Sequence, residues 1–146
     1  MHVADDAFIA DRILWRASKH GLPADDTFAF GNHPESVDVS IATVCSELDT
    51  GDLVLVFGRE HDRWTVLGTR MAVTNFDSSV HVCSYSQIVN LTRAEPLEKK
   101  LVMQFVSVEL RDGTAFNVWG PPGSQFFGLW NILLGLSRMS HGSGYG

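Results

Sequence analysis

The sequence has few cysteines, few cations and no long apolar run, and each shortage argues against a class of protein. Two cysteines among 146 residues are too few for a disulfide framework, so we expect two buried thiols in a reducing cytoplasm. Eleven Lys and Arg face 17 Asp and Glu. This acidic balance disfavours nucleic acid or a bare membrane as partner. We expect no signal peptide and no membrane-spanning segment.

Sequence motifs of catalysis are absent as well. Gly-x-Ser-x-Gly, phosphate-loop and dinucleotide fingerprints do not occur in the chain. His81 and Cys83 share one face of a predicted strand, but a structural zinc site needs about two further protein ligands. A Cys83 nucleophile would lack an orienting acid and an oxyanion hole. The sequence therefore predicts no catalytic residue, no metal ligand and no cofactor.

What is present is typical of one compact domain. Hydrophobic residues make up 45% of the chain and charged residues 19%, and this length suffices to bury a core. The segments 101–110 and 114–119 alternate as strands, and Asp112-Gly113 between them is a strong hairpin signal. Residues 120–123, Gly-Pro-Pro-Gly, cannot continue a strand. Ser124 is a good N-cap for an apolar helix that we expect to reach Met139.

The N-terminal part is predicted to be helical. Asp5 or Asp6 caps a first helix that runs to about His20, with Gly21 as its C′ residue. Phe8 and Trp15 lie together on one face of this helix. A broad apolar stripe occupies the other face and consists of Ile9, Ala10, Ile13, Leu14 and Ala17. A helix with two apolar faces needs two partners, the core and another subunit.

The middle of the chain changes from helix to strand. We expect a loop over Ala24–His33, anchored by Phe28 and Phe30. Residues 37–48 have helical spacing, although their alternating β-branched residues also suit a strand, and we favour a helix that ends at 49–51. The first four strands are predicted at Leu53–Phe57, at Trp64–Thr74 with a bend at Gly68, at Val80–Tyr85 and at Ile88–Thr92. With the later hairpin this makes about six strands.

Two short patterns then point to a family. "WTVLGTRMAV" is followed by "YSQIVNLTR", by the hairpin "FVSVELRDGTAFNVW" and by an apolar helix. This order resembles the bacterial pleckstrin-homology-like family, and the matching residues are 66–71 and 85–88. The likeness covers roughly 48–139. It implies an α+β, mainly β fold: a PH-like barrel of two near-orthogonal antiparallel sheets, capped by the C-terminal helix.

The resemblance also sets the expected domain organisation and argues against one ligand. Residues 1–47 become an N-terminal helical extension, 48–139 the barrel, and 140–146 a mobile tail. Lipid-binding members of the wider family hold phosphoinositides with basic residues around the first hairpin loop. The corresponding segment here, 59–63, has two arginines and two acids, so phosphoinositide binding is not expected.

The last helix has more apolar surface than a barrel plug requires. One stripe contains Phe126, Phe127, Trp130, Leu133 and Leu134, and further apolar surface comes from Leu129, Ile132 and Leu136. We favour a deeply buried helix covered by the N-terminal extension. The alternative is a self-association surface, in which a symmetric dimer would also bury Phe8 and Trp15.

The resulting functional hypothesis is a cytoplasmic, non-enzymatic binding module for protein–protein recognition or homo-oligomer assembly, as a homodimer or larger. The residues predicted for the interface are Phe8, Trp15, Leu129, Ile132 and Leu136. The alternative is a carrier of a small ligand or lipid in a barrel cavity. Metal binding and catalysis are weaker alternatives.

Overall fold

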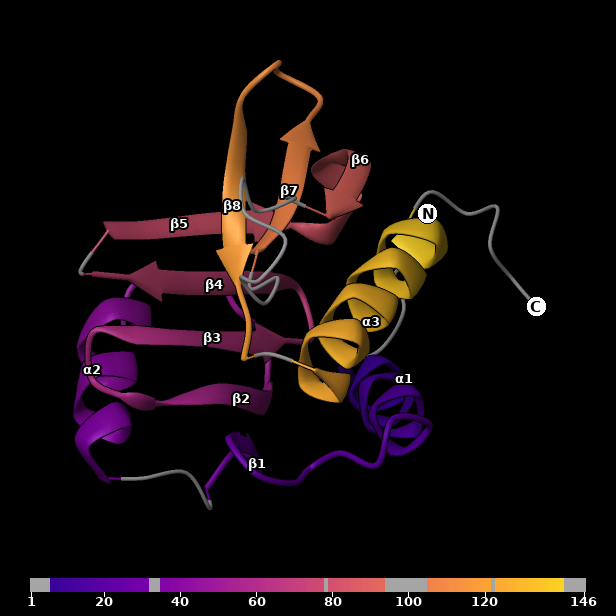
Figure 1. Cartoon of the computed structure of the whole chain (residues 1–146). Coiled ribbons are helices and arrows are strands. Elements are labelled where there is room, and N and C mark those ends of the chain that lie inside the picture. Colours follow the sequence, from indigo (N-terminus) through magenta and orange to yellow (C-terminus); the bar gives the residue numbers. More distant parts are fainter. Residues whose placement is uncertain (1–5, 32–34, 78, 94–104, 122, 141–146) are drawn as a thin grey trace.

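The structure, a computed structural model, describes residues 6–31, 35–77, 79–93, 105–121 and 123–140. Its elements in chain order are α1 (Asp6–Ser18), β1 (Thr27–Ala29), α2 (Glu35–Cys45), β2 (Leu53–Glu60), β3 (Arg63–Gly68), β4 (Met71–Phe76), β5 (Ser79–Ser84), the 3-10 turn η1 (Tyr85–Gln87), β6 (Ile88–Arg93), β7 (Phe105–Leu110), β8 (Ala115–Trp119) and α3 (Ser124–Ser140). The fold is α+β and mainly β. Two antiparallel sheets, β1-β2-β3-β4-β5 and β6-β7-β8, are accompanied by three α-helices (Figure 1).

The first helix forms as the sequence predicts. Ile9, Ile13 and Ala17 recur at helical spacing and are buried. Gly21 follows the helix with a φ of 72°, a left-handed conformation that glycine adopts without steric cost. At the other end, the Asp6 carboxylate places a negative charge in the first turn, where it stabilises the helix dipole.

The predicted single strand over 64–74 is wrong, because the chain reverses in its middle. β3 and β4 form an antiparallel hairpin that turns at Thr69 and Arg70. The amides of these two residues donate to backbone carbonyls of the segment 50–52, each at 2.9 Å. A Cβ on Gly68 would lie 2.3 Å from the Thr50 carbonyl oxygen. A distant segment therefore fixes this turn. No turn-forming dipeptide in the sequence predicts it.

The predicted loop over 24–33 contains a strand that the sequence interpretation missed. β1 pairs antiparallel with β2 and places Thr27 opposite Phe57. Its position is fixed by Gln125 of α3, whose side-chain oxygen accepts hydrogen bonds from the Asp26 amide at 2.9 Å and the Thr27 hydroxyl at 2.8 Å. Three residues are too few for an alternating pattern to be visible. This strand and the division of 64–74 raise the described strands from about six to eight.

The helix expected over 37–48 is confirmed in place of a strand, although α2 ends earlier, at Cys45. The strands predicted at Leu53–Phe57, Val80–Tyr85 and Ile88–Thr92 correspond to β2, β5 and β6, and the predicted hairpin corresponds to β7 and β8. Residues 101–104, the predicted start of the first hairpin strand, lie outside the described residues. Gly113 in the hairpin turn has a φ of 90°, and the Asp112 carboxylate accepts a hydrogen bond from the Thr114 amide at 2.9 Å. Local turn chemistry thus determines this hairpin.

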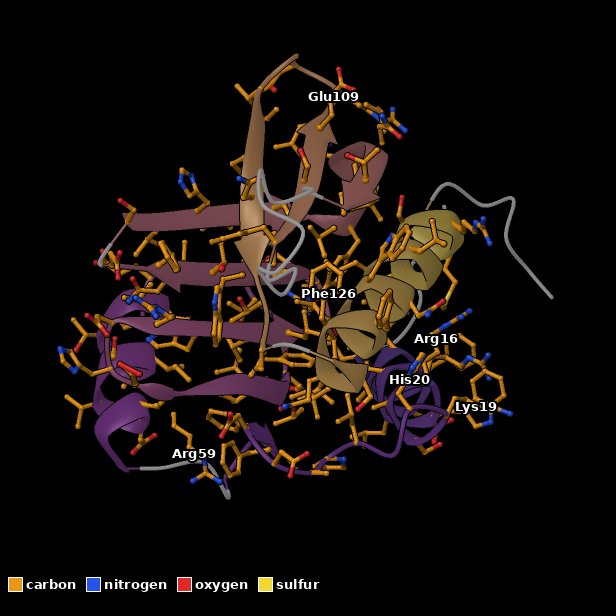
Figure 2. The ribbon with its side chains drawn as sticks, viewed as in Figure 1. Arg16, Lys19, His20, Arg59, Glu109 and Phe126 are labelled. Carbon is orange, nitrogen blue, oxygen red and sulfur yellow. The ribbon has the colours of Figure 1, made fainter. Side chains whose placement is uncertain are left out.

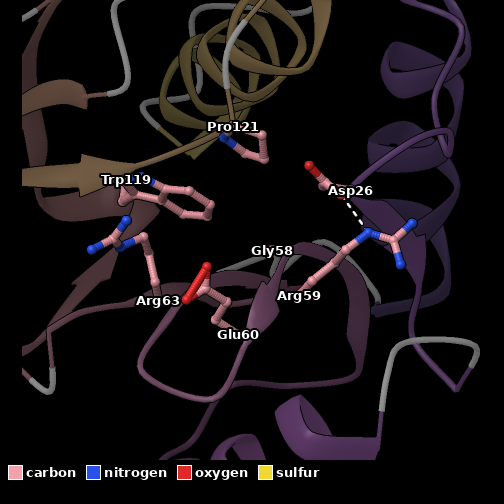
Figure 3. Close-up of a pocket in the computed structure, with 7 residues that line it drawn as sticks. All are labelled: Asp26, Gly58, Arg59, Glu60, Arg63, Trp119 and Pro121. Carbon is pink, nitrogen blue, oxygen red and sulfur yellow. Dashed lines mark hydrogen bonds and ion pairs between the residues drawn. The ribbon is translucent and has the colours of Figure 1, made fainter.

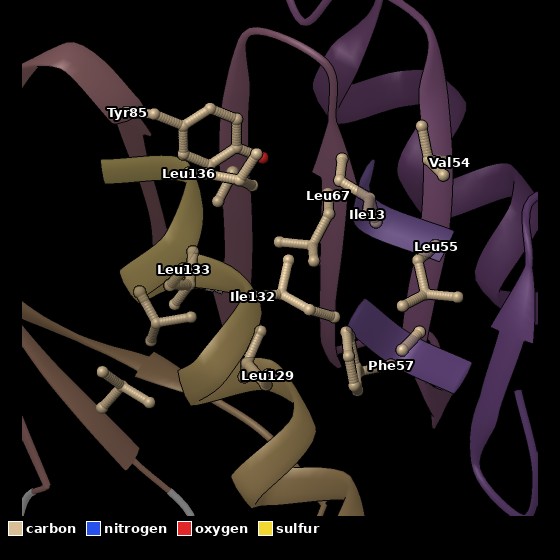
Figure 4. Close-up of a cluster of buried hydrophobic side chains, with 14 of the residues drawn as sticks. Ile13, Val54, Leu55, Phe57, Leu67, Tyr85, Leu129, Ile132, Leu133 and Leu136 are labelled. Atoms are coloured by element: carbon tan, nitrogen blue, oxygen red, sulfur yellow. The ribbon is translucent and has the colours of Figure 1, made fainter. Parts of the chain in front are cut away.

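The central strands of the large sheet, β2, β3 and β4, are buried on both faces. One face packs with α1, α3 and the small sheet into the principal core, which contains Leu55, Phe57 and Leu67. Figure 4 shows these side chains pointing toward the leucines and Ile132 of α3. The other face contributes Val56 and Trp64 to a second cluster under α2. Both α1 and α2, which lie in the predicted extension, therefore complete hydrophobic cores.

A ring of hydrogen bonds joins the two sheets. The Trp119 amide donates to the Thr74 hydroxyl at 3.1 Å, and the Thr65 hydroxyl donates to the Trp119 carbonyl at 2.5 Å. The two threonine hydroxyls lie 2.8 Å apart, so Thr74 donates to Thr65 and all the donors are used. In Figure 1, β8 passes across the strands of the large sheet. The described strands form two separate sheets and not one closed ladder.

The two segments that carry the family resemblance meet in the structure. The hydroxyl of Tyr85 donates to the carbonyl oxygen of Gly68 at 2.7 Å, and both groups are buried. Burial raises the pKa of this phenol well above its ordinary value, so Tyr85 is a neutral donor. The contact ties η1 to the end of β3 and gives the two patterns a shared structural role.

Candidate functional site

Three of the five residues predicted for an interface do not lie on the surface. Leu129, Ile132 and Leu136 are at most 1% exposed and belong to the principal core. They are covered because α1 lies on one side of α3 and the sheets lie on the other (Figure 1). The favoured interpretation of α3 as a buried helix is confirmed. These three side chains are unavailable to a partner in this fold.

The other two predicted residues are exposed. Phe8 is 51% exposed and Trp15 is 44% exposed. They lie two turns apart on α1, opposite the buried stripe of Ile9, Ile13 and Ala17. Leu14 was expected to join the buried stripe but is 41% exposed. The first helix therefore carries large apolar side chains on its solvent side.

Two cations lie against the exposed ring of Trp15. The guanidinium carbon of Arg12 lies 4.3 Å from the centroid of the Trp15 ring, and the Nζ atom of Lys19 lies 4.5 Å from it. These positions precede and follow Trp15 by about one turn, so one helix face carries a continuous stripe. We call Phe8, Arg12, Trp15 and Lys19 the α1 stripe. The sequence pattern predicted the aromatic residues of this stripe, and its cations were not predicted.

A third α1 cation extends this surface toward α3. Arg16 lies so close to Gly135 that a Cβ there would approach its Nε and Cζ atoms to 2.4 Å. Burial, followed by the charges of Arg12 and Arg138, lowers the pKa of Arg16. Its Nε atom is buried and has no hydrogen-bond partner among the described residues. Figure 2 shows Arg16 and Lys19 on α1, beside α3 and far from the hairpin tip at Glu109.

We call Arg12, Arg16 and Arg138 the arginine cluster. They come from α1 and the last turn of α3, two helices at opposite ends of the chain. Arg12 and Arg16 are one helical turn apart, so a helical wheel places them as neighbours. The contribution of Arg138 depends on how α1 packs against α3, which no local pattern reveals.

The first hairpin loop borders a shallow pocket of about 170 Å³, shown in Figure 3. Its lining residues are Asp26, Gly58, Arg59, Glu60, Arg63, Trp119 and Pro121. Arg59 forms an ion pair with Asp26, and Arg63 forms one with Asp77 at 3.0 Å. Both arginines of the loop are thus neutralised by aspartates, and the loop lacks the converging cations that a multiply charged phosphate requires.

The cysteines offer no activated thiol. Burial raises the pKa of Cys45 to about 11 and that of Cys83 to about 12, so both thiols are protonated near neutral pH. His81 stacks on Phe116 with ring centroids 5.0 Å apart. Within the described ranges, no group of three or more His, Cys, Asp or Glu side chains could hold a metal ion.

Protein-family models, curated proteins and solved structures were compared with the chain, and none matches. Within the part of the chain that the structure describes, no helix has both the length and the hydropathy that a membrane span requires.

Proposed function

We propose that this protein is a non-enzymatic binding module of PH-like architecture that recognises a protein partner through the outward face of α1. The architecture is supported by two antiparallel sheets, the passage of β8 over the large sheet and a final helix packed in the core. The Tyr85–Gly68 hydrogen bond links the two segments that resemble the family.

The observation that carries the proposal is the exposure of Phe8 and Trp15 on one helix face. Tryptophan and arginine are the side chains most enriched among residues that dominate binding energy at protein interfaces. The α1 stripe places both types side by side, since Arg12 contacts Trp15. A partner that covers the stripe would remove these aromatic side chains from water.

The charges favour a different protein over a second copy. A symmetric dimer through α1 would place the Arg12 and Lys19 side chains of the two copies against each other. Like charges facing across an interface weaken association. Recognition of another protein avoids this repulsion and keeps the same aromatic contacts.

The carrier alternative receives less support. The space between the large sheet and α3 holds the fully buried side chains of Leu55, Phe57, Leu67, Leu129 and Ile132. A lipid chain would have to displace them, because close-packed interiors leave few voids larger than a water molecule.

Site-specific crosslinking tests the proposal. A photoreactive phenylalanine analogue at Asp11 sits beside the α1 stripe, and the same analogue at Val39 on α2, which is 64% exposed, is the control. In the native host, we expect the Asp11 probe to capture one discrete protein that the Val39 probe does not capture. The captured protein is identified by mass spectrometry and then purified.

Affinity for that purified protein is the decisive measurement. Truncation of an aromatic anchor costs about 2 kcal/mol or more, so Trp15→Ala should weaken binding by at least about tenfold. Calorimetry with the wild type and with a matched Val39→Ala variant checks this. Equal capture from both positions, or unchanged affinity of Trp15→Ala, contradicts the proposal. Capture of a second copy would replace it by homo-oligomer assembly.

A further inference from the structure

We infer that the segment bound at α1 is acidic: its carboxylates pair with the arginine cluster and Lys19, and an apolar side chain rests on Phe8 and Trp15. This inference rests on the proposed function and adds the chemistry of the partner.

The cations of the described residues differ in their ion pairing. Arg59, Arg63 and Arg70 each form an ion pair with an aspartate. Arg12, Arg16, Lys19 and Arg138 form none with the described residues. The chain has 17 acidic side chains for 11 Lys and Arg, so carboxylates are not scarce. Asp6, Asp26, Asp49 and Asp77 pair with other arginines, and the four cations at α1 and α3 have no carboxylate partner among the described residues.

Holding these cations close together is unfavourable in the unbound protein. Arg16 is pressed against α3 at Gly135 with a buried, unpartnered Nε atom. Burial, and then the neighbouring charges of Arg12 and Arg138, disfavour its protonated form. Like-charge neighbours at this spacing destabilise a helix. A bound carboxylate would relieve the repulsion and accept hydrogen bonds from the guanidinium groups.

The size and shape of this surface suit a short peptide segment. The α1 stripe runs from Phe8 to Lys19, about 16 Å at 1.5 Å per residue, and the arginine cluster widens it toward α3. This footprint suits three turns of a helix or a short extended segment. Asp11 lies on the flank away from α3, as the helical period of 100° per residue dictates, so the side of the stripe next to α3 is uniformly basic.

The same surface fits a membrane or a nucleic acid less well. Interfacial helices segregate apolar side chains from cations, whereas Phe8, Arg12, Trp15 and Lys19 alternate within one stripe. A bilayer or duplex would also extend beyond the stripe and meet a chain whose net charge is −6. A peptide segment contacts the basic surface alone.

Fluorescence anisotropy with a defined probe tests the inference. The probe is a labelled twelve-residue peptide with six glutamates and two leucines at helical spacing, and its counterpart has lysine in place of every glutamate. We expect saturable binding of the glutamate peptide alone, with an affinity that falls as salt rises. The Arg16→Gln/Arg138→Gln variant should bind at least about tenfold more weakly.

The matched control is Arg111→Gln, which removes the same charge at the exposed tip of the β7–β8 hairpin. Its affinity should stay within about twofold of the wild type, because Arg111 lies outside the stripe. Thermal melts establish that every variant is folded. An equal loss in Arg111→Gln, or no loss in Arg16→Gln/Arg138→Gln, overturns the inference.

Two further probes separate the partner classes. Vesicles of phosphatidylcholine and phosphatidylserine, or a single-stranded oligonucleotide, overturn the inference if either binds more tightly than the glutamate peptide and depends on the same arginines. If the peptide fails while the Asp11 crosslink succeeds, the acidic partner is refuted and the proposed function stands. If the peptide binds but the crosslink captures no protein, the proposed function is refuted.

Discussion

Two glycines of α3 provide a paired test of how closely α1 packs on it. Gly128 and Gly135 are two turns apart and buried, and each faces side chains from the α1 region. A Cβ at Gly135 would meet the guanidinium of Arg16 at 2.4 Å, and one at Gly128 would meet a buried methyl group of Leu22 at 2.6 Å. Alanine at either site gains about the same helix propensity, ~1 kcal/mol. The two variants therefore differ in the side chain that must make room for the new methyl group, which is Arg16 for Gly135→Ala and Leu22 for Gly128→Ala.

Gly135→Ala should leave the protein as stable as the wild type or raise its free energy of unfolding by up to ~1 kcal/mol. The obstructing group is the end of a flexible side chain whose Nε atom has no partner among the described residues. The guanidinium can swing away from Arg12 and Arg138, which repel it. The melting temperature should then rise by up to roughly 3 °C for a domain of this size.

Gly128→Ala should destabilise the protein. Leu22 is 4% exposed and belongs to the principal core, so its methyl group has little room to retreat. Overpacking of a core costs typically ~1–3 kcal/mol, which offsets or exceeds the propensity gain. We expect the two variants to differ by ~1–3 kcal/mol. Urea and thermal unfolding followed by circular dichroism measure this, and equal destabilisation of both would refute the packing argument.

Three other outcomes follow from the described contacts. Hydrogen bonds from Arg70 and then Thr69 lower the pKa of Asp6 below its ordinary value of 3.8. The contribution of Asp6 to stability is therefore full above pH 3.8 and is lost as the pH falls through the lowered pKa. Thermal melts across the acid range should show this loss in the wild type and not in Asp6→Asn. Thr65→Val should cost ~1–3 kcal/mol in urea unfolding, because it leaves the buried Trp119 carbonyl without its donor. Cys83, whose pKa is raised to about 12, should resist an aromatic disulfide reagent at pH 8 until the protein is unfolded, and rapid native reaction would show that the strand opens.

The elements that the sequence predicted correctly are those determined by local chemistry. The final hairpin follows from Asp112-Gly113, and α1 from its buried stripe and Gly21. The turn between β3 and β4 was not predicted, because Thr69 and Arg70 carry no turn signal and are held by hydrogen bonds to the segment 50–52.

The same distinction between local and long-range determinants applies to the candidate site. Exposure of Phe8 and Trp15 could be predicted from the period of one helix, and the neighbouring cations Arg12 and Lys19 are visible on the same helical wheel. Arg138 could not be associated with them, since its place depends on the packing of α3. The burial of Leu129 likewise depends on the elements packed around α3, which its own pattern does not specify.

The packing of the first helix against the last has a consequence for synthesis. Ile13 completes a core that contains Leu133, and Asp26 is hydrogen-bonded to Gln125, 99 positions later. On the ribosome, α1 emerges long before the residues that will cover its apolar face. Such distant contacts slow folding, and a nascent chain keeps that face exposed until α3 is available. We therefore expect the nascent protein to depend on chaperones until translation has passed α3, and a ribosome-bound chain stalled before residue 124 to be readily cleaved by protease.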